Sequence, residues 1–202
     1  MVTVEPLGRR ERKKAATRQA LADAAWELFI ARGFDGVSVK EVADRADVST
    51  TTLFKHFPSK EALVFDRSDD FEAELIATIH GRPAGQHLLD ALRIHATQAW
   101  VPIAEDPRLS QLGALIEATP SLRRYSEQIW LRHTDALASA IAEDLGRLSD
   151  DLDAATLARF VLDIPALIRT RTNPRQAVQH VFDLLARGWE ATTSENGKPS
   201  SR

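Results

Sequence analysis

The sequence predicts an all-α protein of about nine helices, with a three-helix N-terminal domain followed by a bundle of longer helices. Three features predict this class. Apolar residues recur at spacings of three and four residues through most of the chain, which is typical of helices with one buried face. Segments with the alternating pattern of a strand are rare. Asp-Pro, Thr-Pro and Asn-Pro pairs, at residues 106–107, 119–120 and 173–174, mark three points at which a helix can begin.

The first helix is expected over residues 10–32, after a stretch at residues 1–8 that we expect to be disordered. Gly33 follows it, at the position after a helix end where a left-handed residue is common. Residues 193–202 are rich in Ser, Gly and Pro and are expected to be a second disordered tail. The buried stripe expected on the first helix comprises Leu21, Ala25, Leu28 and Phe29.

Two short helices joined by a tight turn are predicted between Ser38 and Phe57. Ser38-Val-Lys-Glu41 has the spacing of a capping box, in which serine and glutamate each satisfy the other's end of the helix. Ala43 is small enough for two helices to cross closely, and Asp47 stands at the turn, where positive φ is needed. These are the mechanics of a helix-turn-helix. The apolar residues expected to hold it on the first helix are Val39, Val42, Val48, Leu53 and Phe57.

Six longer helices are expected in the rest of the chain, each delimited by proline, glycine or a capping residue. Pro102 should end or kink the second of them. Pro165 lies inside the fifth, where it leaves one carbonyl unpaired and could bend the helix around a cavity. The expected ranges are 59–80, 86–103, 106–118, 120–145, 153–171 and 174–192.

Charge is distributed unevenly along the 202 residues, whose net charge is −3. Residues 1–60 hold 11 Lys and Arg against 8 Asp and Glu, and the remainder holds 15 against 21. A basic N-terminal part on an acidic body favours a nucleic-acid partner for that part alone, although a solvated basic tail explains the charges equally well. The densest cluster comprises Arg9, Arg10, Arg12, Lys13, Lys14 and Arg18.

Several classes of protein are disfavoured by what the sequence lacks. It has no Cys, which excludes disulfide frameworks and thiolate metal sites. It shows neither a signal peptide nor a run of about 18 apolar residues, so we expect a cytoplasmic protein that does not bind membranes. No HExxH, glycine-rich phosphate loop or GxSxG motif is present. We therefore expect a protein that is not an enzyme and holds no metal and no cofactor.

Residues 12–64 resemble the signature of the TetR family of transcriptional regulators. The resemblance rests on an ordered combination of features within the segment ELFIARGFDGVSVKEVADRADVSTTTLFKHFPSKEALV. These features are the end of the first helix, the capping box, the turn, the LFKHF helix and the PSKE segment. Two residues depart from the pattern: Asp47 stands where the family mostly has glycine, and Phe54 where it often has a tyrosine that contacts a DNA phosphate.

The resemblance implies a DNA-binding domain at residues 9–58 whose third helix enters the major groove of a palindromic operator. The threonines at 50–52 would meet base edges, with helix capping as their alternative role. His56, Lys60 and the N–H groups after Ser59 would meet phosphates. The basic cluster before residue 18 could reach a minor groove as a flexible arm or act by long-range attraction. The expected DNA-binding residues are Thr17, Arg18, Ser38, Lys40, Thr50, Thr51, Thr52, Phe54, Lys55, His56 and Lys60.

The resemblance also implies that residues 59–192 form a helical domain for ligand binding and dimerisation. Polar and aromatic residues on apolar helix faces are candidates for an effector site, with plain core packing as the alternative. These candidates are His95, Trp100, Tyr125, Trp130, His133 and Phe160. The last helix carries an apolar stripe expected to meet its copy in a homodimer, or else to pack within the chain. That stripe comprises Val178, Val181, Phe182, Leu185, Gly188 and Trp189.

The expected function is a repressor that a small apolar effector releases from its operator. The alternative is a constitutive dimeric DNA-binding protein whose bundle serves only dimerisation. A weaker resemblance links RRERKKAATRQALADAAWELF and LRRYSEQIWLRHTDALASAIAEDLG to a branch of the family typified by the mycofactocin regulator. That branch implies an acyl-CoA-like effector.

Overall fold

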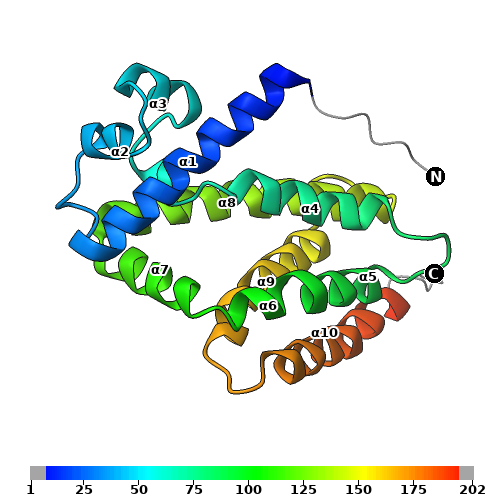
Figure 1. The fold of residues 1–202 in the computed structure, drawn as a ribbon. Helices are drawn as coiled ribbons and strands as arrows, with labels where there is room; N and C mark the ends of the chain where they lie inside the picture. Colours follow the sequence, from blue (N-terminus) through cyan, green and yellow to red (C-terminus); the bar gives the residue numbers. More distant parts are fainter. Residues whose placement is uncertain (1–7, 196–202) are drawn as a thin grey trace. The chain divides into compact units, whose positions relative to one another are not determined.

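The computed structural model describes the backbone of residues 8–195 and the side chains of residues 8–188 (Figure 1). Every regular element in this range is helical. A π-helical turn, Ala96–Trp100, joins α5 to α6, and a 3-10 turn covers Glu61–Leu63. With α5, the π turn and α6 counted as one rod, the described range holds nine helices, so the expected fold class is confirmed. The helices are α1 (Arg9–Arg32), α2 (Val39–Arg45), α3 (Thr50–His56), α4 (Ser68–His80), α5 (Leu88–His95), α6 (Val101–Ala104), α7 (Pro107–Ala118), α8 (Pro120–Asp144), α9 (Leu152–Arg169) and α10 (Pro174–Glu195).

The chain divides into two compact units, which we describe separately. Unit 1 consists of the residues up to Ser68 and of Gln111–Glu127. Unit 2 consists of Asp69–Ser110 and of the residues from Gln128 onward. The functional division expected between residues 58 and 59 stays a prediction. The packing divides the chain differently, since unit 1 extends to Ser68 and also includes residues 111–127.

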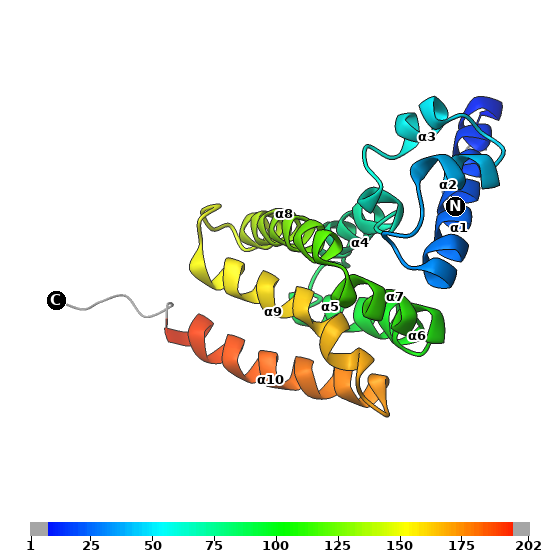
Figure 2. The ribbon, with the colours of Figure 1, turned by 90° about the vertical axis from the view of Figure 1, so that its left-hand side faces the viewer.

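In unit 1, α2 packs against both α1 and α3, and residues of the three helices share a small apolar core (Figure 2). Leu21, Ala25 and Phe29 of the expected stripe are buried, and Leu28 is partly buried. Ala43 is fully buried, as its expected place at the helix crossing requires. The other buried members of this core are Ala24, Phe34, Val37, Val42, Leu53, Phe57, Ala62, Leu63 and Leu122.

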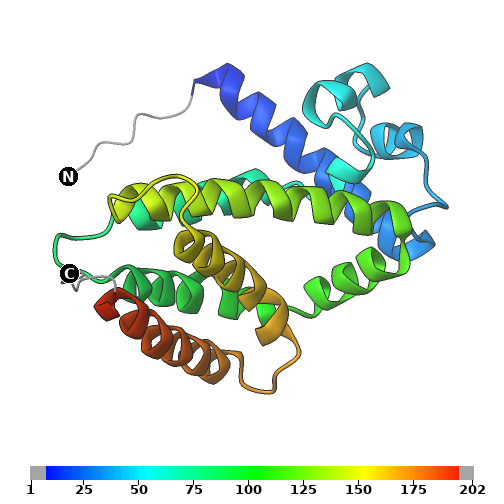
Figure 3. The same cartoon turned by 180° about the vertical axis from the view of Figure 1, so that it is seen from behind.

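Unit 2 is a helical bundle whose core draws residues from α4, α5, the π turn, α8, α9 and α10. In this bundle α9 and α10 lie side by side (Figures 2 and 3). Its largest fully buried side chains include Trp100, Leu75, Ile79, Leu92, Leu137, Ile141, Leu157 and Ile164.

The segment after α3 differs from the single helix expected over residues 59–80. It forms the 3-10 turn Glu61–Leu63, and α4 begins only at Ser68. Ser59 Oγ accepts from the Ala62 N–H at 3.2 Å, and the Asp66 carbonyl accepts from Arg18 at 2.9 Å. The bond from Arg18 is tertiary and occupies a carbonyl that a continuous helix would pair internally, and a long-range contact of this kind is invisible in a local pattern.

Two further boundaries differ from expectation. Residues 193–195, expected to be disordered, continue α10, and the rest of both expected tails lies outside the described residues, apart from Gly8. The expected helix 86–103 contains the π turn in place of a simple end. It precedes Pro102, which has no N–H to donate to the carbonyl of Gln98.

Candidate nucleic-acid interface and bundle interior

The turn of the helix-turn-helix is held by local hydrogen bonds. Asp47 adopts φ 54°, the positive value expected at this position, and the Val48 N–H donates to the Ala43 carbonyl at 3.0 Å. Ser49 then caps α3, since its Oγ accepts from the Thr52 N–H at 3.1 Å and lies 2.9 Å from the Thr52 hydroxyl. The start of α3 is therefore fixed by its own sequence.

Three residues form the exposed face of α3: Thr51, Phe54 and Lys55. Phe54 is a large apolar side chain that is 50% exposed, whereas Leu53 and Phe57 on the opposite face are buried. Thr50 and Thr52 are half-buried, and the Thr52 hydroxyl is engaged with Ser49. We call Thr51, Phe54 and Lys55 the reading face, because their exposed side chains are the ones on α3 that are available to contact DNA bases.

The start of α2 is the capping box that the sequence predicts. Ser38 Oγ accepts from the Glu41 N–H at 3.2 Å, and the Ser38 N–H donates to Glu41 Oε2 at 2.8 Å. Arg32 donates to Glu41 Oε1 at 2.7 Å. The Ser38 backbone N–H, then Arg32 and the Ser38 hydroxyl, lower the pKa of Glu41 to about 2. Lys40 pairs with Asp44 at 2.6 Å on the exposed side of the same helix.

Arg18 is turned into unit 1, where it joins three segments of the chain. It donates to the carbonyl oxygens of His56 and Asp66, both at 2.9 Å, and its Nε lies 2.7 Å from the Asp66 carboxylate. Its guanidinium also lies over the Phe57 ring, 4.5 Å from the centroid. Arg18 was expected to contact DNA, and in the structure its donors are used inside the protein. Thr17, its expected companion, is half-buried on α1.

Lys60 is also turned inward, away from the role expected for it. Its Nζ donates to the Phe34 carbonyl at 2.6 Å and lies 4.1 Å from the centroid of the Phe34 ring. Burial lowers the pKa of this ammonium. The helix N-terminus expected beside it is a three-residue 3-10 turn. Together these observations give Lys60 a packing role within unit 1, and the phosphate contact expected of it stays a prediction.

His56 and the basic cluster complete the expected DNA-binding set. His56 is half-buried at the end of α3, and its Nδ1 has no hydrogen-bond partner among the described residues. Burial, then the charges of Arg18 and Lys14, lower its pKa. The basic residues from Arg9 to Lys14 are exposed on the first turns of α1, so they lie on a helix and not on a flexible arm.

In unit 2, three of the six expected effector residues contact Phe71, which was not among the expected residues, and a fourth contacts one of these three. Trp100, Trp130 and His133 lie 5.8, 5.8 and 5.9 Å from the Phe71 centroid. His95 meets Trp100 edge-on at 5.6 Å. The only sequence signal for Phe71 was its place among the apolar positions of the helix expected over 59–80.

The other two expected effector residues do not join this cluster. Tyr125 belongs to unit 1, where its ring lies 5.4 Å from that of Phe65. Phe160 is 53% exposed on α9. Helical spacing placed both on apolar faces, but it could not tell which neighbour each face would meet.

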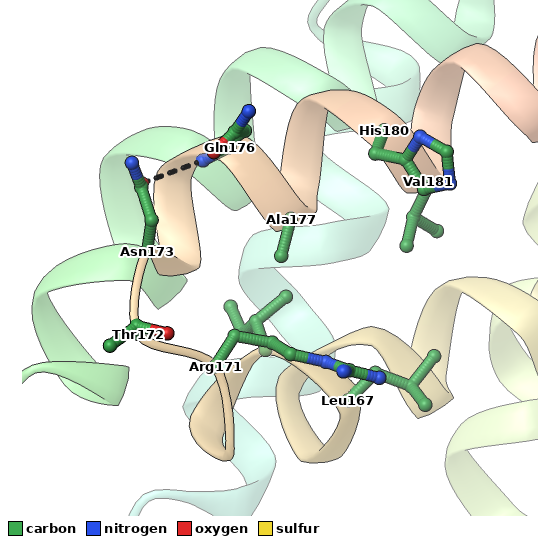
Figure 4. Close-up of a pocket in the computed structure, with 9 residues that line it drawn as sticks. Leu167, Arg171, Thr172, Asn173, Gln176, Ala177, His180 and Val181 are labelled. Atoms are coloured by element: carbon green, nitrogen blue, oxygen red, sulfur yellow. Dashed lines mark hydrogen bonds between the residues drawn. The ribbon is translucent and has the colours of Figure 1, made fainter.

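Unit 2 contains hollows between its helices. One, of about 470 Å³, is lined by residues of α4 and of the α5 and π-turn rod: Glu74, Ala77, Thr78, His95, Gln98 and Ala99. Another, of about 520 Å³, lies between the end of α9 and the start of α10, where Ala177 and Val181 point toward Leu167 and Arg171 (Figure 4). Its turn is ordered by Asn173, whose side chain accepts from the Gln176 N–H at 3.0 Å.

The stripe expected to form a dimer interface on α10 faces the chain's own core. Val178 and Phe182 are 0% and 2% exposed, and Val181 and Leu185 pack against the same core. Gly188 is exposed, and the side chain of Trp189 lies outside the described residues. Val178 and Phe182 therefore pack within one chain, which is the alternative left open for this stripe, and the role of the stripe in a dimer stays a prediction. The exposed large apolar residues on α9 and α10 are Leu152, Phe160, Leu167 and Leu184.

The described residues hold no group of three or more His, Asp or Glu placed to bind a metal ion. None of the helices among them has the length and apolar content needed to cross a membrane.

Comparison with known proteins places this geometry in a family. Residues 21–66 match the family described as bacterial regulatory proteins, tetR family. The chain is 30% identical over 166 residues to the HTH-type transcriptional regulator TcmR of Streptomyces glaucescens, covering 78% of this chain and 71% of TcmR. It is 28% identical over 155 residues to the putative mycofactocin biosynthesis transcriptional regulator MftR of Mycobacterium tuberculosis, covering 76% and 78%.

Solved structures share the fold at lower identity. FadR from Bacillus subtilis, in complex with stearoyl-CoA, matches with a TM-score of 0.57 and 18% identity over 83% of this chain and 96% of FadR. The SmeT-triclosan complex matches with a TM-score of 0.56 and 19% identity over 84% and 89%.

Proposed function

Because the chain belongs to the TetR family, we propose that it is a repressor whose reading face binds an operator and whose unit 2 binds a releasing effector. The observation that carries the DNA-binding part is the exposure of Thr51, Phe54 and Lys55 on a helix whose other face is buried. In helix-turn-helix proteins the second helix of the motif lies in the major groove. A threonine methyl and a phenyl ring suit the thymine methyl, and a lysine suits guanine or phosphate.

The protein acts as a homodimer on a palindromic operator in the cytoplasm. Two reading faces, one from each copy, meet half-sites about 34–36 Å apart or a multiple of that distance. The exposed residues Phe160, Leu167 and Leu184 on α9 and α10 supply the apolar surface for this pairing. They replace the buried stripe of α10 as the expected interface.

Binding of a small molecule to unit 2 is supported by polar atoms buried without partners in its interior. Trp100 and His133 are each 2% exposed, and their ring nitrogens have no hydrogen-bond partner among the described residues. A bundle that served only dimerisation would gain nothing from such groups, since buried polar groups are normally paired. Related folds hold stearoyl-CoA in FadR and triclosan in SmeT. The effector is a largely apolar molecule, with an acyl-CoA-like compound as the other candidate.

Selection of bound DNA from a random pool, followed by titration with and without small molecules that raise the melting temperature, tests this function. We expect a palindromic site and an effector that weakens operator binding. By linkage, the operator must weaken effector binding by the same factor. Tight binding of a small molecule that leaves operator affinity unchanged would favour the constitutive DNA-binding protein.

A further inference from the structure

The ring of Phe71, in the first turn of α4, stacks with two flat rings in unit 2. Its plane makes an angle of 27° with Trp100 and 28° with His133, and Trp130 meets it nearly edge-on at 84°. Stacked and edge-to-face pairs at these separations are the favoured geometries of aromatic groups. The residues around Phe71 therefore form an environment that suits a flat aromatic ring.

The residues of this aromatic cluster carry polar atoms without hydrogen-bond partners, and the phenyl group of Phe71 cannot supply any. Trp100 Nε1, both ring nitrogens of His133 and Glu72 Oε2 are buried without a hydrogen bond among the residues that the structure describes. Glu72 Oε2 lies 3.6 Å from His133 Nε2, which is too long for a hydrogen bond. Leaving several such groups unsatisfied around one side chain is unfavourable.

The unsatisfied groups offer a defined set of donors and acceptors. The indole N–H of Trp100 can only donate, and an ionised Glu72 can only accept. Burial, then the charge of Arg132, lower the pKa of His133, so its imidazole is neutral and presents one donor and one acceptor. A ligand that suits this set carries both a hydroxyl and an oxygen acceptor on its rim.

We propose that Phe71 is an internal substitute for the effector, and that the effector is a planar aromatic molecule with hydroxyl and carbonyl groups on its rim. This inference rests on the effector response proposed above. The effector's rings displace Phe71 and stack on Trp100 and His133. One rim hydroxyl donates to Glu72, and an oxygen accepts from the Trp100 indole. A saturated acyl chain has no flat face for these rings and no polar atoms for these partners.

Displacement of Phe71 also gives the binding event a structural consequence. Asp69, two residues before Phe71, pairs with Arg132 of α8 at 2.6 Å, and the same guanidinium lies 3.8 Å from Glu72. Movement of the Phe71 side chain out of the cluster therefore disturbs the first turn of α4, the helix that follows the DNA-binding segment.

The proposal is tested by titrating the protein with 1,8-dihydroxyanthraquinone and measuring binding through the quenching of tryptophan fluorescence. The fused rings, hydroxyls and carbonyls of this compound match the cluster, while anthraquinone lacks the hydroxyls and dodecanoate lacks the rings. We expect the dihydroxy compound to bind more tightly than anthraquinone, and dodecanoate to bind no better than anthraquinone.

Phe71→Ala should bind the dihydroxy compound roughly tenfold more tightly than the wild type does, because a competing internal group has been removed. His133→Leu should weaken binding, and Leu131→Ala, which truncates an exposed neighbour on α8, should not change it.

Two outcomes overturn the proposal: equal affinity of the wild type and Phe71→Ala for the ring compounds, or preferential binding of dodecanoate that Phe71→Ala enhances. If Phe71→Ala fails to fold, Phe71→Leu serves instead, with a smaller gain expected because leucine is a poorer stacking partner. Operator affinity is measured in parallel. A non-aromatic compound that binds unit 2 and releases the operator overturns the aromatic assignment and leaves the proposed function standing. Binding of the dihydroxy compound without operator release supports the site and contradicts the proposed function.

Discussion

The guanidinium of Arg18, on α1, donates a 2.9 Å hydrogen bond to the backbone carbonyl of His56, the last residue of α3. The same side chain holds Asp66 through its carbonyl and its carboxylate. The end of the reading helix and the segment before α4 are therefore fastened to one residue of α1. We therefore expect Arg18 to position α3 through these contacts and not by contacting DNA.

Replacing Arg18 by Gln should lower the free energy of unfolding by about 1–2 kcal/mol, with allowance for its partial exposure. Operator affinity should fall because α3 is less firmly held. The salt dependence of binding should stay unchanged, whereas loss of a phosphate contact would reduce its slope by about 1. Thermal melts and titrations at several salt concentrations measure both quantities. Arg10→Gln, on the exposed start of α1, is the stability control, and a reduced slope in Arg18→Gln alone would contradict the positioning role.

Lys60 and Lys55 should respond oppositely to the same substitution. Lys60→Met removes a hydrogen bond to the Phe34 carbonyl and should lower the melting temperature with no change in salt slope. Lys55→Met removes an exposed charge from the reading face, and should keep the melting temperature while reducing the salt slope by about 1. If Lys60→Met instead reduces the slope, its ammonium leaves Phe34 when DNA binds.

The sequence was sufficient to predict features that depend on residues close together in the chain. The capping box at Ser38, the positive φ at Asp47 and the buried crossing at Ala43 depend on residues close in the chain, and all three expectations are confirmed. The family and the all-α class follow from the same local signals. The π turn before Pro102 was not predicted, because its pattern resembles that of an ordinary helix.

The parts that the sequence did not predict depend on contacts between distant residues. A basic side chain beside the helix-turn-helix can face DNA or a carbonyl group of the protein, and nothing local distinguishes Arg18 from Lys55. An apolar stripe can face a partner or its own core, as Val178 shows. Phe71 acquired its neighbours only when α4, α8 and the π turn came together.

Stability should fall as the pH is lowered from 7 to 5, partly through His133. Burial lowers the pKa of this residue in the folded protein, so the unfolded chain binds a proton first. Its contribution to stability is therefore fully present above the ordinary histidine pKa of about 6.5, and is lost as the pH falls toward the folded value. The carboxylates of Glu72 and Asp69 and the guanidinium of Arg132 face this imidazole; the Arg132 charge lowers its pKa as burial does, and the two together outweigh the opposing charge of Asp69.

His133→Phe keeps a flat ring in the cluster and removes the titrating group. Its melting temperature should fall less than that of the wild type between pH 7 and pH 5. Part of the fall should remain, because burial also lowers the pKa of His95 and His56. The exposed His87 provides the control His87→Gln, which should behave like the wild type. Identical pH profiles for His133→Phe and the wild type would show that His133 does not contribute.

Leu184→Glu should dissociate the dimer while leaving each chain folded. Leu184 is 50% exposed on α10, so a carboxylate there meets water in the free chain but an apolar surface in the proposed interface. Light scattering should report a monomer at micromolar concentration, with an unchanged circular dichroism spectrum. Leu148→Glu makes the same change at a residue that is 79% exposed, outside α9 and α10, and should stay dimeric. A dimeric Leu184→Glu protein would place the interface elsewhere.

Phe54 should read thymine through its methyl group. The ring is half exposed on α3 and has no polar atom, so its contribution to sequence preference must come from apolar contact. Once an operator has been selected, replacing each thymine in turn by deoxyuracil removes one methyl without changing any hydrogen bond of the base. At the position that Phe54 meets, the wild type should lose about 1 kcal/mol of binding free energy, the order expected for loss of one buried methyl. Phe54→Ala should bind both operators with nearly equal affinity, whereas Thr51→Ala should lose its preference at a different base pair. If every thymine can be replaced without cost in the wild type, Phe54 does not meet a base. Its exposed ring then contacts the sugar-phosphate backbone, and Phe54→Ala should weaken binding to all sequences alike.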